Sequence, residues 1–152
     1  MKIDEIDRKI IRELQRDGRI LNNELAKRVG LSPSPCLRRV KLLEDAGIIS
    51  RYVAIIDQTK VGLRLSMFAR VWLMAQDAET ITLFIEAMRR LPEVVECYIM
   101  LGESDALLRV VVADLDDYRR FQSTHLTRKN GIQNVKTDVP SEIVKQTFAL
   151  PV

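Results

Sequence analysis

The run from Asn22 to Gly47 constrains the fold of this chain more than any other part of the sequence. Apolar residues at helical spacing between Leu25 and Val29 predict a short helix, and Gly30 is suited to the left-handed backbone that ends many helices. Ser32–Pro35 then supplies hydroxyl groups for helix capping and prolines that fit the first turn of a second helix. Two short helices joined by so tight a turn predict a helix-turn-helix.

The second of these helices is expected to have two different faces. Leu37, Val40 and Leu43 are predicted to face a core, whereas Arg38 and Lys41 are predicted to point away from it. When a helix-turn-helix binds DNA, the start of its second helix enters the major groove, where arginine and serine side chains reach base edges and phosphates. The alternative is an ordinary helical hairpin with a solvated basic face.

Positive charge is concentrated in the half of the chain that contains this motif. Residues 1–62 hold 13 Lys+Arg and 9 Asp+Glu, a net charge of +4, whereas residues 63–152 hold 11 and 12, a net charge of −1. Between Glu24 and Lys41, five basic residues accompany a single acid. Because phosphate binding needs such a local excess, the charge favours a DNA-binding half over a plain hairpin.

Neighbouring side chains of the second helix are predicted to have different roles. Arg38 lies opposite the expected core face and is the candidate for a contact with a base edge. Arg39 lies about 100° around the helix, where it either contacts a phosphate or pairs with an acid. Ser32 and Ser34 are expected to cap the helix first and to donate to phosphate second. The predicted DNA-binding residues are Asn22, Ser32, Ser34, Pro35, Arg38, Arg39 and Lys41.

A first helix and a linker complete the predicted N-terminal domain. Apolar residues at helical spacing from Ile3 to Leu14 predict the helix. Ile48–Asp57 is rich in β-branched residues and predicts a strand or short wing, and Gln58–Leu65 predicts a linker. We therefore expect a three-helix winged helix-turn-helix with its linker strand in residues 1–62, and a second domain in residues 63–152.

The second half alternates between strand-like and helical patterns of apolar residues. The predicted elements are a strand at Met67–Ala75, a helix at Ala78–Leu91, strands at Val94–Leu101 and Ala106–Ala113, a helix from Leu115 to Leu126 and a weaker strand at Ile132–Ile143. This βαββαβ order is the ferredoxin-like arrangement of an α+β domain, in which helices cover one face of the sheet. We expect the opposite face to expose Val71, Cys97, Ile99, Val110 and similar residues, and a second copy of the chain to cover it.

Several function classes are disfavoured by the composition. Cys36 and Cys97 lack the CxxC spacing of a zinc site and are expected to be reduced thiols of a cytosolic protein. No apolar run is long enough for a membrane span, and the first residues are too charged for a signal peptide. His125 stands alone, and no catalytic constellation, cofactor motif or metal site is found, so an enzyme is the weaker alternative. An RNA platform would need stacking aromatics on the central strands, which offer only Tyr98.

The strongest guide to function is a set of motifs spread over nearly the whole chain. These are Asp4-x-x-Asp7-x-x-Ile10, Asp17-Gly18-Arg19, Glu24-Leu25-Ala26, the run Gly30–Cys36, Arg39-Val40, Leu43-Glu44, Gly47-Ile48-Ile49, the turn Gly102-Glu103-Ser104-Asp105 and the run Glu142-Ile143-Val144-Lys145. Together they resemble the Lrp/AsnC, or feast/famine, family of transcription regulators. The resemblance implies a sequence-specific DNA-binding regulator of amino-acid metabolism or transport genes. It also implies dimerisation through the sheet, assembly of dimers into octamers, and an amino-acid effector bound at contacts between dimers.

The same resemblance implies where the effector binds. The expected effector-binding residues are Leu101, Gly102, Glu103, Ser104, Asp105 and Asp138. Asp105 and Asp138 are expected to meet in one pocket, and Asp105 either pairs with the effector's ammonium group or merely closes its turn. Two carboxylates would favour a polar or cationic amino acid over an aliphatic one. The effector itself, the operator sequence and the direction of regulation stay open.

Overall fold

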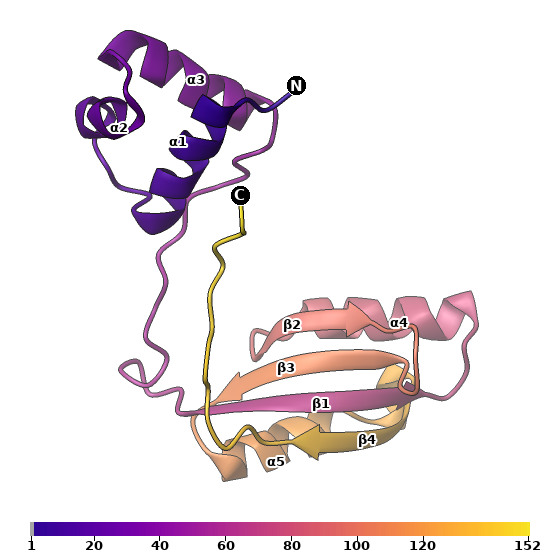
Figure 1. Cartoon of the computed structure of the whole chain (residues 1–152). Helices are drawn as coiled ribbons and strands as arrows, with labels where there is room; N and C mark the ends of the chain where they lie inside the picture. The colour runs from indigo at the N-terminus through magenta and orange to yellow at the C-terminus, as the bar shows by residue number, and fades with distance from the viewer. Residues whose placement is uncertain (1) are drawn as a thin grey trace. The chain divides into compact units, whose positions relative to one another are not determined.

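The chain consists of two structural units in a computed structural model that describes residues 2–152 (Figure 1). The first unit runs to Ile55 and also includes Lys145–Val152, while the second is Ile56–Val144. The division therefore differs from the one expected at residue 62, and the last eight residues return to the first unit. There, Leu150 exchanges two hydrogen bonds with the Gln15 side chain, at 2.6 and 3.1 Å.

The first unit is a bundle of three helices, α1 (Glu5–Arg16), α2 (Asn22–Val29) and α3 (Pro33–Asp45). Each contributes an apolar stripe to one small core, as helices at this spacing must to remove those side chains from water. The fully buried members of this core are Ile10, Leu25, Ala26, Val29, Cys36 and Leu43. The predicted three-helix architecture is confirmed.

The turn between α2 and α3 has the predicted glycine but not the predicted cap. Gly30 has a φ of 78°, the left-handed conformation that ends α2. Ser32 occupies the cap position of α3, yet its side chain makes no capping hydrogen bond. A capping side chain accepts a hydrogen bond from the backbone N–H of the second or third residue of its helix. The third residue of α3 is Pro35, which has no backbone N–H. Pro33 occupies the first helical position, as expected.

The core face of α3 differs from the predicted stripe at one position. Cys36 and Leu43 are fully buried and Val40 packs beside them, at the i, i+4, i+7 spacing of one face. Leu37, which was predicted to join them, is 57% exposed. The prediction for Leu37 is therefore wrong, because a small cysteine one position earlier fills the closely packed site against α1 and α2.

The segment Ile48–Asp57 forms no strand in the described chain, contrary to the sequence prediction. Its apolar residues Val53, Ile55 and Ile56 are each more than 60% exposed. A strand needs a neighbouring strand to satisfy its backbone groups, and the four strands seen in residues 2–152 pair only with one another. High β-propensity alone therefore gave no strand here.

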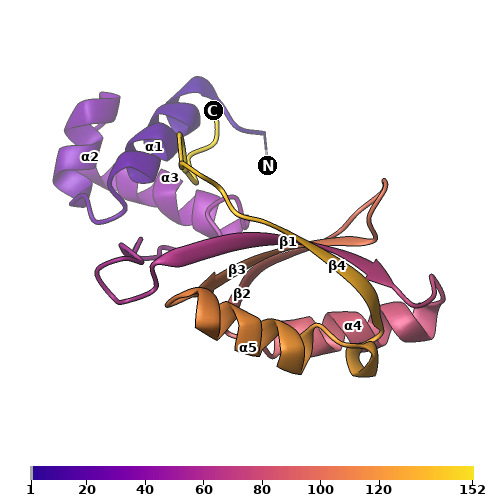
Figure 2. The same cartoon turned by 90° about the horizontal axis from the view of Figure 1, so that it is seen from below.

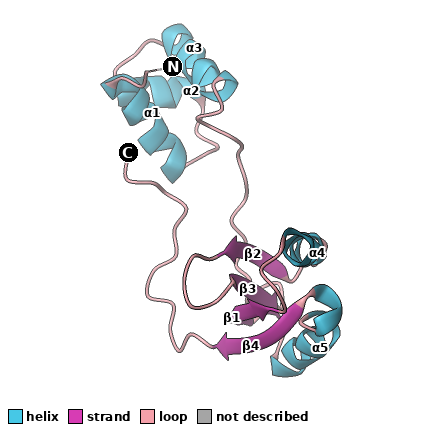
Figure 3. Cartoon of the chain, turned by 90° about the vertical axis from the view of Figure 1, so that its right-hand side faces the viewer, coloured by secondary structure: helices cyan, strands magenta, loops and turns pink. Residues whose placement is uncertain are grey.

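The second unit has the predicted βαββαβ order (Figure 1). Its elements are β1 (Leu65–Leu73), α4 (Ala78–Arg89), β2 (Val94–Ile99), β3 (Ala106–Val112), α5 (Leu115–His125), the short helix η1 (Arg128–Asn130) and β4 (Ile132–Asp138). The strands lie in the order β2-β3-β1-β4, and all neighbours are antiparallel. Helices α4 and α5 cover one face of the sheet (Figures 2 and 3). This is the ferredoxin-like arrangement.

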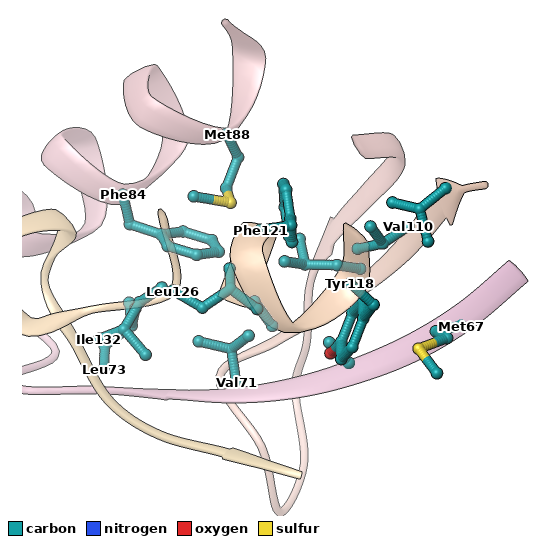
Figure 4. Packing of buried hydrophobic residues seen from close by; sticks show 14 residues of the cluster. Met67, Val71, Leu73, Phe84, Met88, Val110, Tyr118, Phe121, Leu126 and Ile132 are labelled. Atoms are coloured by element: carbon teal, nitrogen blue, oxygen red, sulfur yellow. The ribbon is translucent and has the colours of Figure 1, made fainter. Parts of the chain in front are cut away.

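The core of this unit lies between the sheet and its two helices (Figure 4). Alternate residues of β1, including Val71, point toward Phe84 and Met88 of α4 and toward Tyr118 and Phe121 of α5. The Tyr118 hydroxyl lies 2.6 Å from the half-buried Thr137 hydroxyl, so the buried phenol has a hydrogen-bond partner. Burial raises the pKa of Tyr118, although the bond to Thr137 opposes this.

The open face of the sheet, opposite the helices, is not the apolar surface that the sequence suggested. Val71 and Val110 belong to the helix-covered core, and Cys97 and Ile99 pair in register with other core-facing residues. The open face instead mixes apolar side chains with ion pairs. It carries Phe68, Trp72, Tyr98 and Leu107, together with the pairs Arg70–Asp138 at 3.0 Å and Arg109–Glu96 at 2.7 Å.

Candidate DNA-binding surface and effector turn

The outer face of α3, defined here as Ser34, Arg38 and Lys41, points away from the core of the first unit. These residues stand at i, i+4 and i+7, and all are exposed. Among the described residues, Arg38 and Lys41 have no acidic partner within ion-pair distance. The structure thus places both cations where the sequence predicted, free to meet an external anion.

Arg39 takes the second of its two predicted roles and pairs with acids. Its Nη1 donates to Asp7 Oδ1 at 2.7 Å and to Asp4 Oδ2 at 2.8 Å. These bonds, first Asp7 and then Asp4, raise the pKa of Arg39. The Asp7 backbone N–H, and then Arg39, lower the pKa of Asp4 below its usual value. Arg39 therefore holds α3 against the start of α1.

The same two acids begin α1. Asp7 donates its backbone N–H to Asp4 Oδ1 at 2.8 Å, and Asp4 donates its own to Asp7 Oδ2 at 3.1 Å, a reciprocal capping box. Asp7 is only 3% exposed, so its charge needs the nearby guanidinium. The spacing Asp4-x-x-Asp7 was the sequence signal for this cluster, but nothing in it pointed to Arg39.

A second basic residue of the helix-turn-helix is also neutralised. Arg28 bonds to Glu24 at 3.0 Å and to Glu13 at 3.1 Å. Of the five basic residues between Glu24 and Lys41, the described contacts therefore pair Arg28 and Arg39 and leave Lys27, Arg38 and Lys41. Within the helix-turn-helix, Arg38 and Lys41 are therefore the cations of α3 that stay available to an external anion.

Asn22 connects the starts of the two motif helices. Its Nδ2 donates to the Pro33 carbonyl at 2.8 Å, while its Oδ1 is buried without a hydrogen-bond partner in the described chain. Ser32, Ser34 and Pro35 are exposed around the same helix start. The structure gives Asn22 a positioning contact, and direct DNA contact by these four residues stays a prediction.

The effector turn, residues 101–105, is fastened to the end of β1. The Asp105 carboxylate accepts the Leu73 backbone N–H and the Gln76 amide, both at 2.8 Å. The Trp72 indole donates to the Glu103 carbonyl at 2.9 Å. Both oxygens of Asp105 thus have donors. The Asp105 backbone carbonyl also accepts the Met100 N–H at 2.9 Å, which is the turn closure through the backbone that the sequence left as an alternative.

The tip of the effector turn is open to solvent. Leu101 is fully exposed, Glu103 is exposed, and Ser104 is buried. A Cβ added at Gly102 would meet nothing within 4 Å, and the φ of Gly102 is not in the left-handed region. No backbone conformation therefore requires glycine here, although its missing side chain leaves the peptide accessible.

Asp138 does not share a pocket with Asp105 inside one chain. Asp138 pairs in register with Phe68, and its carboxylate accepts from the Arg70 guanidinium. The effector turn is instead hydrogen-bonded to β1 at Val71–Leu73. At about 3.3 Å per residue, three to five residues of β1 separate the two sites by roughly 10–17 Å. The two carboxylates therefore lie apart within one chain, and their meeting at a contact between dimers stays a prediction.

A shallow hollow that the sequence did not predict lies between the effector turn and β4. It has a volume of about 320 Å³ and is lined by Trp72, Glu103, Gln133, Asn134 and Lys136. The Lys136 ammonium stands 5.3 Å from the centre of the Trp72 ring, a cation–π contact. Trp72 and the β4 residues meet through the register of β1 and β4, and the Trp72 bond to Glu103 adds the turn, so no local sequence signal could have revealed the hollow.

Other candidate groups have ordinary surroundings. The His125 ring lies 5.4 Å from that of Phe121 at the end of α5. Within residues 2–152, no group of three or more His, Cys, Asp or Glu side chains is placed to hold a metal ion. Nor does any described helix combine the length and apolar character that crossing a membrane requires.

Two family models and many known proteins match this chain. Residues 3–50 match the family model for winged helix-turn-helix DNA-binding domains, and residues 66–150 match that for the Lrp/AsnC ligand-binding domain. Transcriptional regulator AzlB of Bacillus subtilis is 38% identical over 99% of this chain and 96% of its own. The leucine-responsive regulatory protein of Escherichia coli is 40% identical over 97% of this chain and 90% of its own.

The solved structures agree as well. A transcriptional regulator from Neisseria meningitidis, crystallised with L-Met, superposes with a TM-score of 0.95. It is 38% identical, and the match covers 99% of this chain and 97% of the other. Matching domains, extensive identity and a shared fold lead to one conclusion: the chain belongs to the Lrp/AsnC family of transcription regulators, with a DNA-binding helix-turn-helix domain and a ligand-binding domain.

Proposed function

We propose that this chain binds specific DNA sequences through the outer face of α3 and that an amino acid modulates this binding. The observation that carries the proposal is the contrast between paired and unpaired arginines. Arg28 and Arg39 are held by acids, whereas Arg38 and Lys41 point outward without a described partner. Cations displayed on the outer face of a second motif helix are suited to phosphates and to the acceptors of guanine.

The effector turn is the proposed contact site for the amino acid. The E. coli relative is named for its response to leucine, and the Neisseria structure contains L-Met. In this chain the open peptide at Gly102 and the exposed carboxylate of Glu103 support a role in binding a small zwitterion. Asp105 supports the turn itself, because both of its oxygens already accept hydrogen bonds.

Self-assembly completes the proposal. A second copy would cover the open face of the sheet, where Phe68, Trp72 and Tyr98 stand between two ion pairs. Dimers would assemble further, to an octamer by family resemblance, and place effector turns at contacts between dimers. The protein would act in the cytoplasm on genes of amino-acid metabolism or transport, by binding and not by catalysis.

Effector control is tested by titrating DNA with the full chain in the presence of each standard amino acid. The duplex is one selected by the protein from a random pool, and thermal melting identifies any amino acid that prefers the folded state. We expect at least one amino acid to raise the melting temperature and to change the apparent DNA affinity. If none of them alters either quantity, amino-acid control is contradicted.

Gly102→Ala locates the effector site. The added methyl group enters open space at an ordinary φ, so the variant should melt like the wild type. It should nevertheless weaken the amino-acid response, because the methyl group would occupy the approach to the peptide. Leu83→Ala, at a 46% exposed position of α4 outside the effector turn, is the control. An undiminished response in Gly102→Ala would move the effector site away from this turn.

A further inference from the structure

Leu37 is an apolar side chain on a surface otherwise suited to DNA. It is 57% exposed and belongs neither to the core of the first unit nor to the apolar residues packed against that core. Isolated exposed leucines are common on protein surfaces. Leu37, however, has a position on α3 that favours a functional role.

Leu37 shares a helix face with two residues of the outer face of α3. It stands three residues after Ser34 and four before Lys41, and side chains at these spacings are neighbours on a helix surface. It also lies in the second turn of α3, near the end that enters the major groove in a helix-turn-helix complex. A side chain in this position meets base edges together with its polar neighbours.

The major groove presents one apolar group on its base edges, the C5-methyl group of thymine. A leucine brought against the groove therefore has one favourable base partner and loses contact area over cytosine, which lacks that methyl group. We propose that Leu37 packs against a thymine methyl group and sets a preference for thymine at one position of each half-site. This inference rests on the proposed DNA-binding role of the outer face of α3.

The test compares the full chain with two variants of the same helix. Duplexes are first selected from a random pool by the wild type, by Leu37→Ala and by Leu42→Ala. Leu42 is the matched control, because it is 47% exposed, lies outside the core cluster and stands more than one turn further from the helix start. Each thymine of the wild-type duplex is then replaced by uracil, which removes only the methyl group.

For the wild type, replacing the contacted thymine of one half-site by uracil should raise the dissociation constant about fourfold, which corresponds to the loss of one buried methyl group. For Leu37→Ala, uracil at that position should have no effect, and the thymine preference there should disappear from the selected pool. Leu42→Ala should respond like the wild type. Both variants should melt like the wild type, because neither side chain packs in the core.

Each other outcome is decisive. Equal uracil sensitivity in the wild type and Leu37→Ala would overturn the inference while leaving DNA binding intact. Loss of the same sensitivity in Leu42→Ala would assign the effect to the whole helix and not to Leu37. A clearly lower melting temperature for Leu37→Ala would place the side chain inside the protein. If the wild type enriches no sequence, the proposed function fails as well.

Discussion

Arg38 and Arg39 are adjacent in sequence but have opposite surroundings. Arg39 is held by Asp4 and Asp7, whereas Arg38 points outward beside Lys41. Helical geometry predicted that they would differ, since neighbours point about 100° apart. The sequence could not show whether Arg39 contacts a phosphate or forms an ion pair with an acidic residue, because the acidic residues approach it only in the folded bundle.

Substitution of the two outward cations should have different effects on DNA binding. Arg38→Ala is expected to weaken binding to a selected duplex by about 1–3 kcal/mol and to relax the preference at one position, as for loss of a bidentate base contact. Lys41→Ala should weaken all duplexes alike and reduce the slope of log affinity against log salt by about one. Salt titrations on selected and shuffled duplexes measure both. An Arg38→Ala variant with unchanged sequence preference would exclude Arg38 from base contact.

Asp105→Ala is predicted to destabilise the second unit before any effector is considered. Removal of the carboxylate leaves the Leu73 N–H and the Gln76 amide without their acceptor, which should cost about 1–3 kcal/mol of unfolding free energy. Urea denaturation measures this loss. Glu103→Ala, at an exposed neighbour, should change the free energy by no more than about 0.5 kcal/mol. Equal stability of the two variants would show that the Asp105 bonds contribute little.

At the level of elements, the sequence predicted the order and type of every α-helix and paired strand, but not the short helix η1. Periodicity succeeds here because each element buries one regular stripe. It failed at Leu37, whose predicted place in the core is taken by Cys36, and at Ile48–Asp57, which has no partner strand among the described residues. It also could not assign strand faces, which placed Val71 on the wrong side of the sheet. Pairing and register are properties of the folded sheet, not of a local segment.

The contact between α1 and α3 should make stability depend on acid through Asp4. The pKa of Asp4 in the folded chain lies below the usual 3.8, so ionised Asp4 stabilises the folded state fully at pH values above 3.8. This stabilisation is lost as the pH falls through the lowered pKa. Arg39→Met removes one cause of the lowering, while the Asp7 N–H bond remains. The difference in unfolding free energy between wild type and Arg39→Met should therefore shrink as the pH falls below about 4.

Urea denaturation across this pH range measures that difference. Arg16→Met is the control, since it breaks a pair whose arginine is 72% exposed and should lower stability only slightly at any pH. A difference between wild type and Arg39→Met that stays constant into acid would show that Asp4 does not depend on Arg39.

For the whole molecule, assembly should depend on the open face of the sheet. Phe68→Glu places a carboxylate on this face in register with Asp138, so it should oppose association without entering the core. Leu83→Glu adds the same charge at a 46% exposed position of α4 and is the control. Sedimentation at micromolar concentration should show the wild type and Leu83→Glu as dimers or larger, and Phe68→Glu as a smaller species. A monomeric wild type would refute assembly through the sheet.

Sequence-specific DNA binding is the central claim, and the ratio of two dissociation constants tests it most directly. The full chain is titrated with its selected duplex and with a shuffled duplex of the same length and composition, at one near-physiological salt concentration. A regulator that uses base edges should prefer the selected duplex by a factor on the order of 10³ or more. A protein that contacts only phosphates would bind both alike, because that attraction does not depend on sequence. Equal dissociation constants for the two duplexes would contradict the claim.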